Sequence, residues 1–134
     1  MRARAKGPFE VKITPQANDA PAEGSTLGRM SISKQYRGDL VGIGVGEMLT
    51  AGTAVAGSAA YVAVERVTGT LAGRAGTFAL QHAGTMTRGE PHLLITVVPD
   101  SGTGELLGLD GTMLITIADG AHSYELDYSI AGTR

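Results

Sequence analysis

The sequence predicts an all-β protein, an eight-stranded antiparallel up-and-down β-barrel. Three observations support this: short runs of alternating apolar residues, turn signals between the runs, and 20 glycines among 134 residues. That glycine content is about twice the usual ~7%, and it follows no collagen-like repeat. The glycines separate the apolar runs, as expected for tight turns, bulges and bends. No segment keeps a helical period for three turns.

The first four expected strands each place alternate apolar side chains on one face. They are 8–14 with Phe9, Val11 and Ile13; 28–38 with Met30, Ile32 and Tyr36; 40–50 with Val41, Ile43, Val45 and Leu49; and 59–71 with Tyr61, Ala63, Val67 and Leu71.

The last four expected strands follow the same rule. They are 77–86 with Phe78, Leu80 and Met86; the nearly continuous apolar run 91–99; 112–118; and 122–130 with Tyr124, Leu126, Tyr128 and Ile130. The glycine-rich stretch 99–112 is expected to be a compact loop across one barrel end. Eight strands with short links can close their sheet and so leave no exposed edge, and a β-sandwich is the alternative.

Length and composition limit the class of protein. A chain of 134 residues fits one domain, 1–134, and no cysteine is present for disulfides or thiolate metal sites. The net charge is -2 with no basic block, which argues against a nucleic-acid or membrane-surface partner. No apolar run approaches the roughly 18 residues of a membrane span. No apolar segment follows the basic residues at the start, so we expect a cytoplasmic protein.

Four ionisable residues fall in phase with apolar faces. They are Lys34, Glu47, Glu65 and His82. Folding the hairpin 59–86 about Gly73-Arg74 makes paired residue numbers sum to 147, which puts His82 directly opposite Glu65. Opposite Cβ atoms in an antiparallel pair lie about 4.5–5.5 Å apart, so this register predicts a buried carboxylate–imidazole pair. A one-residue shift of the turn would flip one strand's faces and remove the pair.

The Glu65–His82 pair has three interpretations. It can be a satisfied polar pair that fixes strand register, it can orient a ligand, or it can exchange protons near neutral pH. In the last case, Glu65 and His82 are the catalytic residues. Glu47 has the same interpretations, with Lys34 or a tyrosine hydroxyl as its structural partner. Lys34 is expected to extend to the barrel rim rather than to act as a base.

Further residues are candidates to line a ligand cavity. With Glu47 and Lys34 these are Tyr36, Tyr61, Phe78, Leu80, Tyr124 and Tyr128. The tyrosines are first of all packing residues with a polar end. His92 and His122 lie next to turns and are expected at the surface. No metal site is expected, because the three histidines are far apart and lack acidic partners at ligand spacing.

Several segments carry a family resemblance that covers most of the chain. YVAVERVTGTLAGRAGTFALQHAGTM followed by VVPDSGTGELLGLDGT resembles the DUF3224 family of small bacterial proteins of unknown function. That family is grouped with the allene oxide cyclase-like β-barrels. The resemblance implies the barrel fold of the cyclases and the related dirigent proteins, which hold an apolar substrate while it cyclises or couples. It also implies a homo-oligomer, a dimer or larger.

The resemblance transfers no catalytic residue, because the motifs of the plant cyclase have no match in this chain. From the residues themselves we expect a small apolar or amphipathic metabolite inside the barrel, oriented by Glu65 and His82. Any reaction would be an acid–base isomerisation or cyclisation without a cofactor. The alternatives are a carrier without catalysis and a structural barrel with a filled core. Turnover would distinguish an enzyme from a carrier. The volume of the interior would distinguish a filled structural barrel from both.

Overall fold

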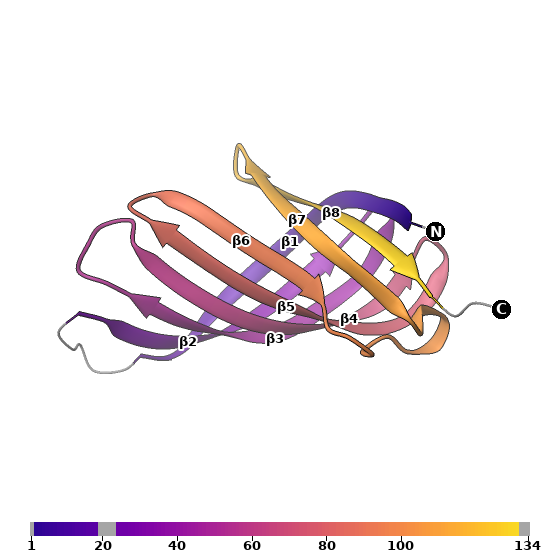
Figure 1. Cartoon of the computed structure of the whole chain (residues 1–134), viewed down its shortest axis with the longest axis horizontal. Coiled ribbons are helices and arrows are strands. Elements are labelled where there is room, and N and C mark those ends of the chain that lie inside the picture. Colours follow the sequence, from indigo (N-terminus) through magenta and orange to yellow (C-terminus); the bar gives the residue numbers. More distant parts are fainter. Residues whose placement is uncertain (1, 19–23, 132–134) are drawn as a thin grey trace.

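Eight antiparallel strands follow one another around a closed barrel, each bonded to its neighbours in the sequence (Figure 1). This arrangement is seen in a computed structural model that describes residues 2–18 and 24–131. It confirms the predicted eight-stranded barrel. Within the described residues, the one helical element is a short 3₁₀ turn, and no helix there is long and apolar enough to cross a membrane.

The elements have the following bounds. They are β1 (Arg2–Asn18), β2 (Thr26–Tyr36), β3 (Leu40–Gly52), β4 (Ala59–Leu71), β5 (Arg74–Thr87), β6 (Glu90–Val97), η1 (Gly104–Leu106), β7 (Leu109–Ala118) and β8 (Ala121–Ile130). β1 begins six residues before its predicted start, and its first part pairs with β8 from Arg2↔Ser129 to Phe9↔His122. Its inward positions there are Ala3, Ala5 and Gly7, which are too small to give an apolar alternation signal.

The register of the β4–β5 hairpin differs from the prediction by two residues. Ala72 and Gly73 both have positive φ, 48° and 85°, and form the two-residue turn, with Leu71 opposite Arg74. Glu65 is therefore opposite Leu80, and His82 is opposite Ala63. The predicted direct pairing of Glu65 with His82 is wrong. A shift of two residues keeps every side chain on its face, so Glu65 and His82 remain diagonal neighbours inside the barrel.

Three glycines occupy the middle of the inward face of β3, between Leu40 and Met48. Gly42, Gly44 and Gly46 face the interior, whereas Val41, Ile43, Val45 and Leu49 face outward. Glu47 shares this outward face: its side chain is 62% exposed and lies 3.6 Å from Arg29. The predicted inward position of Glu47 is therefore wrong.

The position of Gly44 has no room for a side chain, because Glu65 and Tyr36 occupy the space in front of it. A Cβ at this position would overlap the Glu65 carboxylate and lie 3.2 Å from the Tyr36 ring. We expect Gly44→Ala to lower the free energy of unfolding by about 1–3 kcal/mol, the usual cost of overpacking a core. Gly52→Ala, in the same strand but with open space around it, is the control and should stay within about 0.5 kcal/mol. Guanidinium denaturation of both variants measures this, and equal losses would contradict the assignment.

One half of the barrel is filled with side chains. Phe78, Leu80, Val67 and Leu126 are at most 1% exposed and belong to one core cluster. The connection between β6 and β7 covers this end, as predicted. Within it Thr103 N–H donates to the Thr77 carbonyl (2.8 Å), and Leu106 in η1 is fully buried.

The other half of the barrel is open on one side. β6 and β7 pair only at Ile95↔Met113 and Thr96↔Thr112, whereas every other neighbouring pair of strands has at least eight paired positions. Beyond Ile95 the two strands separate, and the β7–β8 hairpin leans away from β6 (Figure 1). We call the unpaired segments 90–94 and 114–118 the β6–β7 split.

Candidate functional site

Three donors surround one buried carboxylate at the middle of the barrel. Oε1 of Glu65 lies 2.9 Å from His82 Nε2 and 3.1 Å from Lys34 Nζ. Oε2 accepts a 2.5 Å hydrogen bond from the Tyr36 hydroxyl. The side chains of Glu65, His82 and Lys34 are 0%, 3% and 5% exposed. The predicted Glu65–His82 contact is confirmed, although the register that suggested it is not.

The surroundings of Glu65 keep it ionised. Burial alone would raise the pKa of its carboxyl. The hydrogen bond from His82, the charge of Lys34 and the hydrogen bond from Tyr36 outweigh burial and hold that pKa below its usual range. Burial and the nearby Glu65 charge raise the pKa of the Tyr36 hydroxyl far above its ordinary value, so Tyr36 acts as a hydrogen-bond donor.

Lys34 is a buried partner of Glu65 rather than a residue of the barrel rim. Alternation along β2 puts Lys34 between the inward-facing Ile32 and Tyr36, as expected. Its Nζ lies 5.1 Å from the centroid of the Phe9 ring and 5.7 Å from that of Tyr36. An ammonium this deep in a protein needs an opposite charge, and Glu65 supplies it. The expectation that Lys34 extends to the rim is therefore wrong.

A cavity of about 160 Å³ lies in the open half of the barrel, directly above this cluster. Lys34 and His82 line it, whereas Glu65 lies behind them. Its aliphatic walls come from five strands and comprise Val11, Ile13, Ile32, Met48, Leu93, Ile115 and Ile117. Leu93 lies on one side of the β6–β7 split, and Ile115 and Ile117 lie on the other, so the split adjoins the cavity.

The other predicted lining residues have different positions. Tyr61 lines the cavity, and its ring packs across Gly84 of the neighbouring strand. Phe78, Leu80 and Tyr128 lie in the filled core cluster. Tyr36 lies behind the cavity with Glu65, and Glu47 is on the outer surface.

Tyr124 holds the β2–β3 turn. Its hydroxyl accepts a hydrogen bond from Leu40 N–H (2.8 Å) and donates one to the Arg37 carbonyl (2.7 Å). We expect Tyr124→Phe to lower the free energy of unfolding by about 1–3 kcal/mol, because it strands a buried backbone donor. Tyr61 is the control, since its hydroxyl makes no hydrogen bond within residues 2–18 and 24–131. Tyr61→Phe should leave a thermal or chemical denaturation curve nearly unchanged.

His122 is a cavity residue, although its place next to a turn predicts a surface position. It lines the cavity, and its ring centroid lies 5.2 Å from that of Phe9. The signal for this position was present, because His122 alternates in phase with Tyr124 and Leu126 of the same strand. His92 is exposed, as expected.

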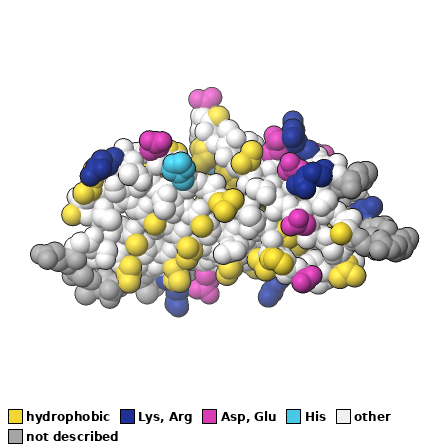
Figure 2. Space-filling model, in the orientation of Figure 1, with side chains coloured by type: hydrophobic (Ala, Val, Ile, Leu, Met, Phe, Trp, Pro, Cys, Tyr) yellow, Lys and Arg dark blue, Asp and Glu magenta, His cyan; other side chains and the backbone are white. Residues whose placement is uncertain are grey.

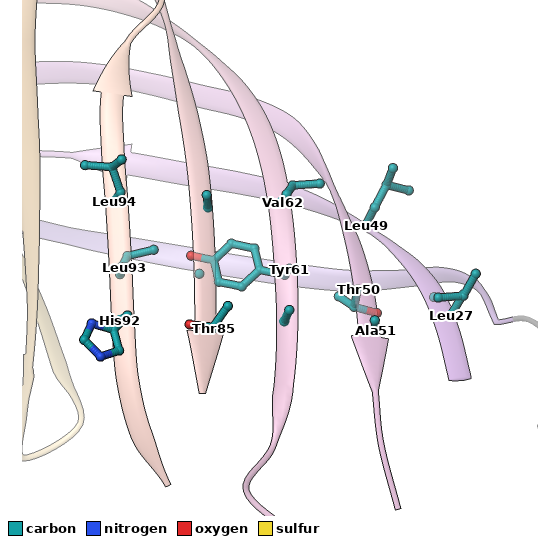
Figure 3. A pocket seen from close by; sticks show the side chains of 14 residues that line it. Leu27, Leu49, Thr50, Ala51, Tyr61, Val62, Thr85, His92, Leu93 and Leu94 are labelled. Carbon is teal, nitrogen blue, oxygen red and sulfur yellow. The ribbon is translucent and has the colours of Figure 1, made fainter. Parts of the chain in front are cut away.

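A second concave region lies largely on the outside of the barrel. This groove, of about 670 Å³, crosses β2 to β6 at the open end (Figure 3). Its outward-facing apolar side chains include Leu27, Leu49, Val62 and Leu94. No Asp, Glu, Lys or Arg lines it, and His92 is the one histidine in its lining. Across the part of the chain that the structure describes, no group of three or more His, Asp and Glu side chains could hold a metal ion.

These features define a class: a small antiparallel β-barrel, filled at one end, with an ion cluster under a cavity at the other. The family model "Protein of unknown function (DUF3224)" matches residues 5–128. The chain belongs to the DUF3224 family, as its sequence motifs predicted. A crystal structure of a DUF3224 protein of unknown function from Shewanella oneidensis MR-1 is 47% identical, with a TM-score of 0.90. The similarity covers 98% of this chain and 100% of that one. No curated protein matches this chain.

Proposed function

We propose that this barrel binds a small apolar or amphipathic molecule in the cavity at its open end. The observation that carries this proposal is the cavity itself, with aliphatic walls and two buried polar side chains, Lys34 and His82, at its floor. Ligand sites typically combine apolar walls with a few placed polar groups. A cavity of about 160 Å³ also weighs against a barrel that is filled throughout.

The ligand reaches the cavity through the β6–β7 split. The residues on the two sides of the split line the same cavity, and five positions on each strand lack a ladder partner there. A side opening of this kind admits a molecule without breaking any strand pair. The opposite end is closed by the packed core and by Leu106.

Proton transfer is the chemistry that this site supports best. His82 faces the cavity and holds Glu65 at its other side, so the imidazole can exchange a proton with a ligand while the carboxylate fixes its orientation. Glu65 is then a positioning residue. A cofactor-free isomerisation or cyclisation fits this arrangement, and a carrier without catalysis uses the same contacts for affinity alone.

Probe binding tests the location of the site. N-phenyl-1-naphthylamine, a neutral dye that brightens in apolar surroundings, should bind the wild-type protein. Met48→Trp, whose side chain lines the cavity, should abolish the brightening. Leu49→Trp, the next residue on the outer face, is the matched control and should retain it. Loss with Leu49→Trp alone would place the site in the outer groove and overturn the proposal. Native mass spectrometry of protein from its own host tests for a co-purified ligand.

The outer face of the barrel supports the homo-oligomer implied by the family resemblance. Six outward side chains of β3 and β4 are each 50–60% exposed: Val41, Ile43, Val45, Leu49, Val62 and Val64. Hydrophobic side chains are visible over the outer surface in Figure 2. The outward residues Glu47 and Arg66 lie among them. Exposed apolar patches often mark interfaces, and a second copy of the chain is the proposed partner. Light scattering of wild type and Val64→Lys checks this, and a monomeric wild type would refute it.

A further inference from the structure

The two polar side chains that face the cavity have unused hydrogen-bonding capacity. An ammonium group carries three N–H donors. Within the described residues, the one hydrogen-bond acceptor of Lys34 Nζ is Glu65 Oε1, at 3.1 Å. Lys34 is only 6% exposed, so its remaining donors have the cavity as their main outlet. A buried donor without a partner is unfavourable, and an acceptor supplied by a ligand would remove that cost.

His82 lines the same cavity, and its second ring nitrogen is not used by its contact with Glu65. Glu65 is a carboxylate, which can only accept hydrogen bonds, so Nε2 of His82 carries the hydrogen of their 2.9 Å contact. Nδ1 makes no hydrogen bond to any described residue. Nδ1 is an acceptor in the neutral imidazole and a donor in the imidazolium ion.

The charge balance of the cluster decides which ligand fits. Glu65 and Lys34 cancel when His82 is neutral. An anionic ligand would add an uncompensated buried charge, and a proton on His82 would restore neutrality. Of the other titratable groups, Tyr61 and His122 line the cavity and Tyr36 lies beneath it. No carboxylate lines the cavity, so none would repel an anion at close range.

We propose that the cavity selects ligands whose buried end is an anionic oxygen group, of which a carboxylate is the simplest, and binds them with one proton taken up by His82. The oxygen atoms accept from Lys34 and from Nδ1–H of the imidazolium. The apolar remainder lies between the aliphatic walls and extends toward the β6–β7 split. This inference rests on the proposed function, because it names the ligand class of the same cavity.

Head-group preference is the first test. Octanoate, 1-octanol and octylamine share one chain length and differ in charge. We expect calorimetric titration to show octanoate bound at least about tenfold more tightly than octanol, which is a difference of about 1.4 kcal/mol. The double variant Lys34→Met/Glu65→Gln removes both charges together and should abolish the preference. Lys12→Met, on the exposed outer side of β1, makes the same change away from the cavity and should keep it.

Proton uptake is the second test. Titrations near pH 8, where an ordinary imidazole is mostly neutral, in two buffers of different ionisation enthalpy measure the protons bound with each ligand. We expect close to one proton per octanoate and none per octanol. His82→Gln should abolish the uptake, whereas His92→Gln, an exposed histidine outside the cavity lining, should retain it.

The outcomes separate this inference from the proposed function. Octanol binding as tightly as octanoate, or octanoate binding without proton uptake, would overturn the inference and leave a ligand-binding barrel. Preference for octylamine would also overturn it. If none of the three compounds binds and the dye does not bind either, both the inference and the proposed function fail.

Discussion

Glu65→Ala is expected to lower the free energy of unfolding by about 3–5 kcal/mol, the usual cost of leaving a buried charge without its partner. The variant removes the carboxylate that accepts from Lys34, His82 and Tyr36, and all four side chains are buried. The loss should appear in guanidinium denaturation as a lower midpoint with an unchanged slope.

Two comparisons make this result specific to the buried cluster. Glu47→Ala removes a carboxylate from the outer face, where its contact with Arg29 is solvated, and should change stability by less than about 1 kcal/mol. Lys34→Met/Glu65→Gln removes both buried charges and should recover much of the stability that Glu65→Ala loses. Equal losses in Glu65→Ala and Glu47→Ala would mean that the cluster is hydrated rather than buried.

The contribution of Glu65 should also depend on pH in one direction. The pKa of Glu65 is lower in the folded protein than its usual value. A carboxyl of this kind stabilises the fold at every pH above its unfolded pKa, about 4.3. That stabilisation is lost as the pH falls through the lower folded value. The stability difference between wild type and Glu65→Gln should therefore be constant near neutral pH and shrink in acid. A difference that grows below pH 4 would contradict the assignment.

A disulfide across the β6–β7 split is expected to slow ligand uptake by about tenfold or more, because binding would then require the closed strands to separate. Leu94 and Leu114 are the first residues beyond the last ladder pair, Ile95↔Met113, and both point outward. Leu94→Cys/Leu114→Cys therefore leaves the cavity walls intact. The chain has no other cysteine, so the reduced form of the same protein is its own reference.

A second disulfide controls for general stiffening. Gln81→Cys/Thr96→Cys joins partners in the fully paired β5–β6 ladder and should leave the rate of uptake unchanged. Stopped-flow mixing with the dye measures both variants. Slow uptake in both, or in neither, would exclude the split as the way into the cavity.

The number of strands and their order could be predicted from alternation, but the facing of β3 could not. Val41, Ile43 and Val45 point outward because Glu65 and Tyr36, which belong to other strands, take the space inside the barrel at Gly44. A single strand does not reveal that its neighbours fill its side of the core. Alternation therefore predicts an inward Glu47, and the glycines at 42, 44 and 46 are the one local sign to the contrary.

The ion cluster was half predictable. Strand phase alone places Glu65 and His82 on one face. That prediction is correct despite a register error of two residues, because side chains alternate with a period of two. Lys34 on β2 lies two strands away from Glu65 on β4, so its approach to Glu65 depends on the curvature of the closed sheet. Barrel closure likewise decides where β6 and β7 separate, and no residue type marks that position in the sequence.

The short β6–β7 ladder should affect how fast backbone amides at the open end of the barrel exchange their hydrogens. Amides of residues 90–94 and 114–118 that face the split lack ladder acceptors there, so their hydrogens should exchange with solvent much faster than those of β4 and β5 near Phe78. Local opening at this end then requires no global unfolding. An occupied cavity would slow exchange on both strands at once, so protection along the two edges would report ligand occupancy even for a ligand that has no optical signal.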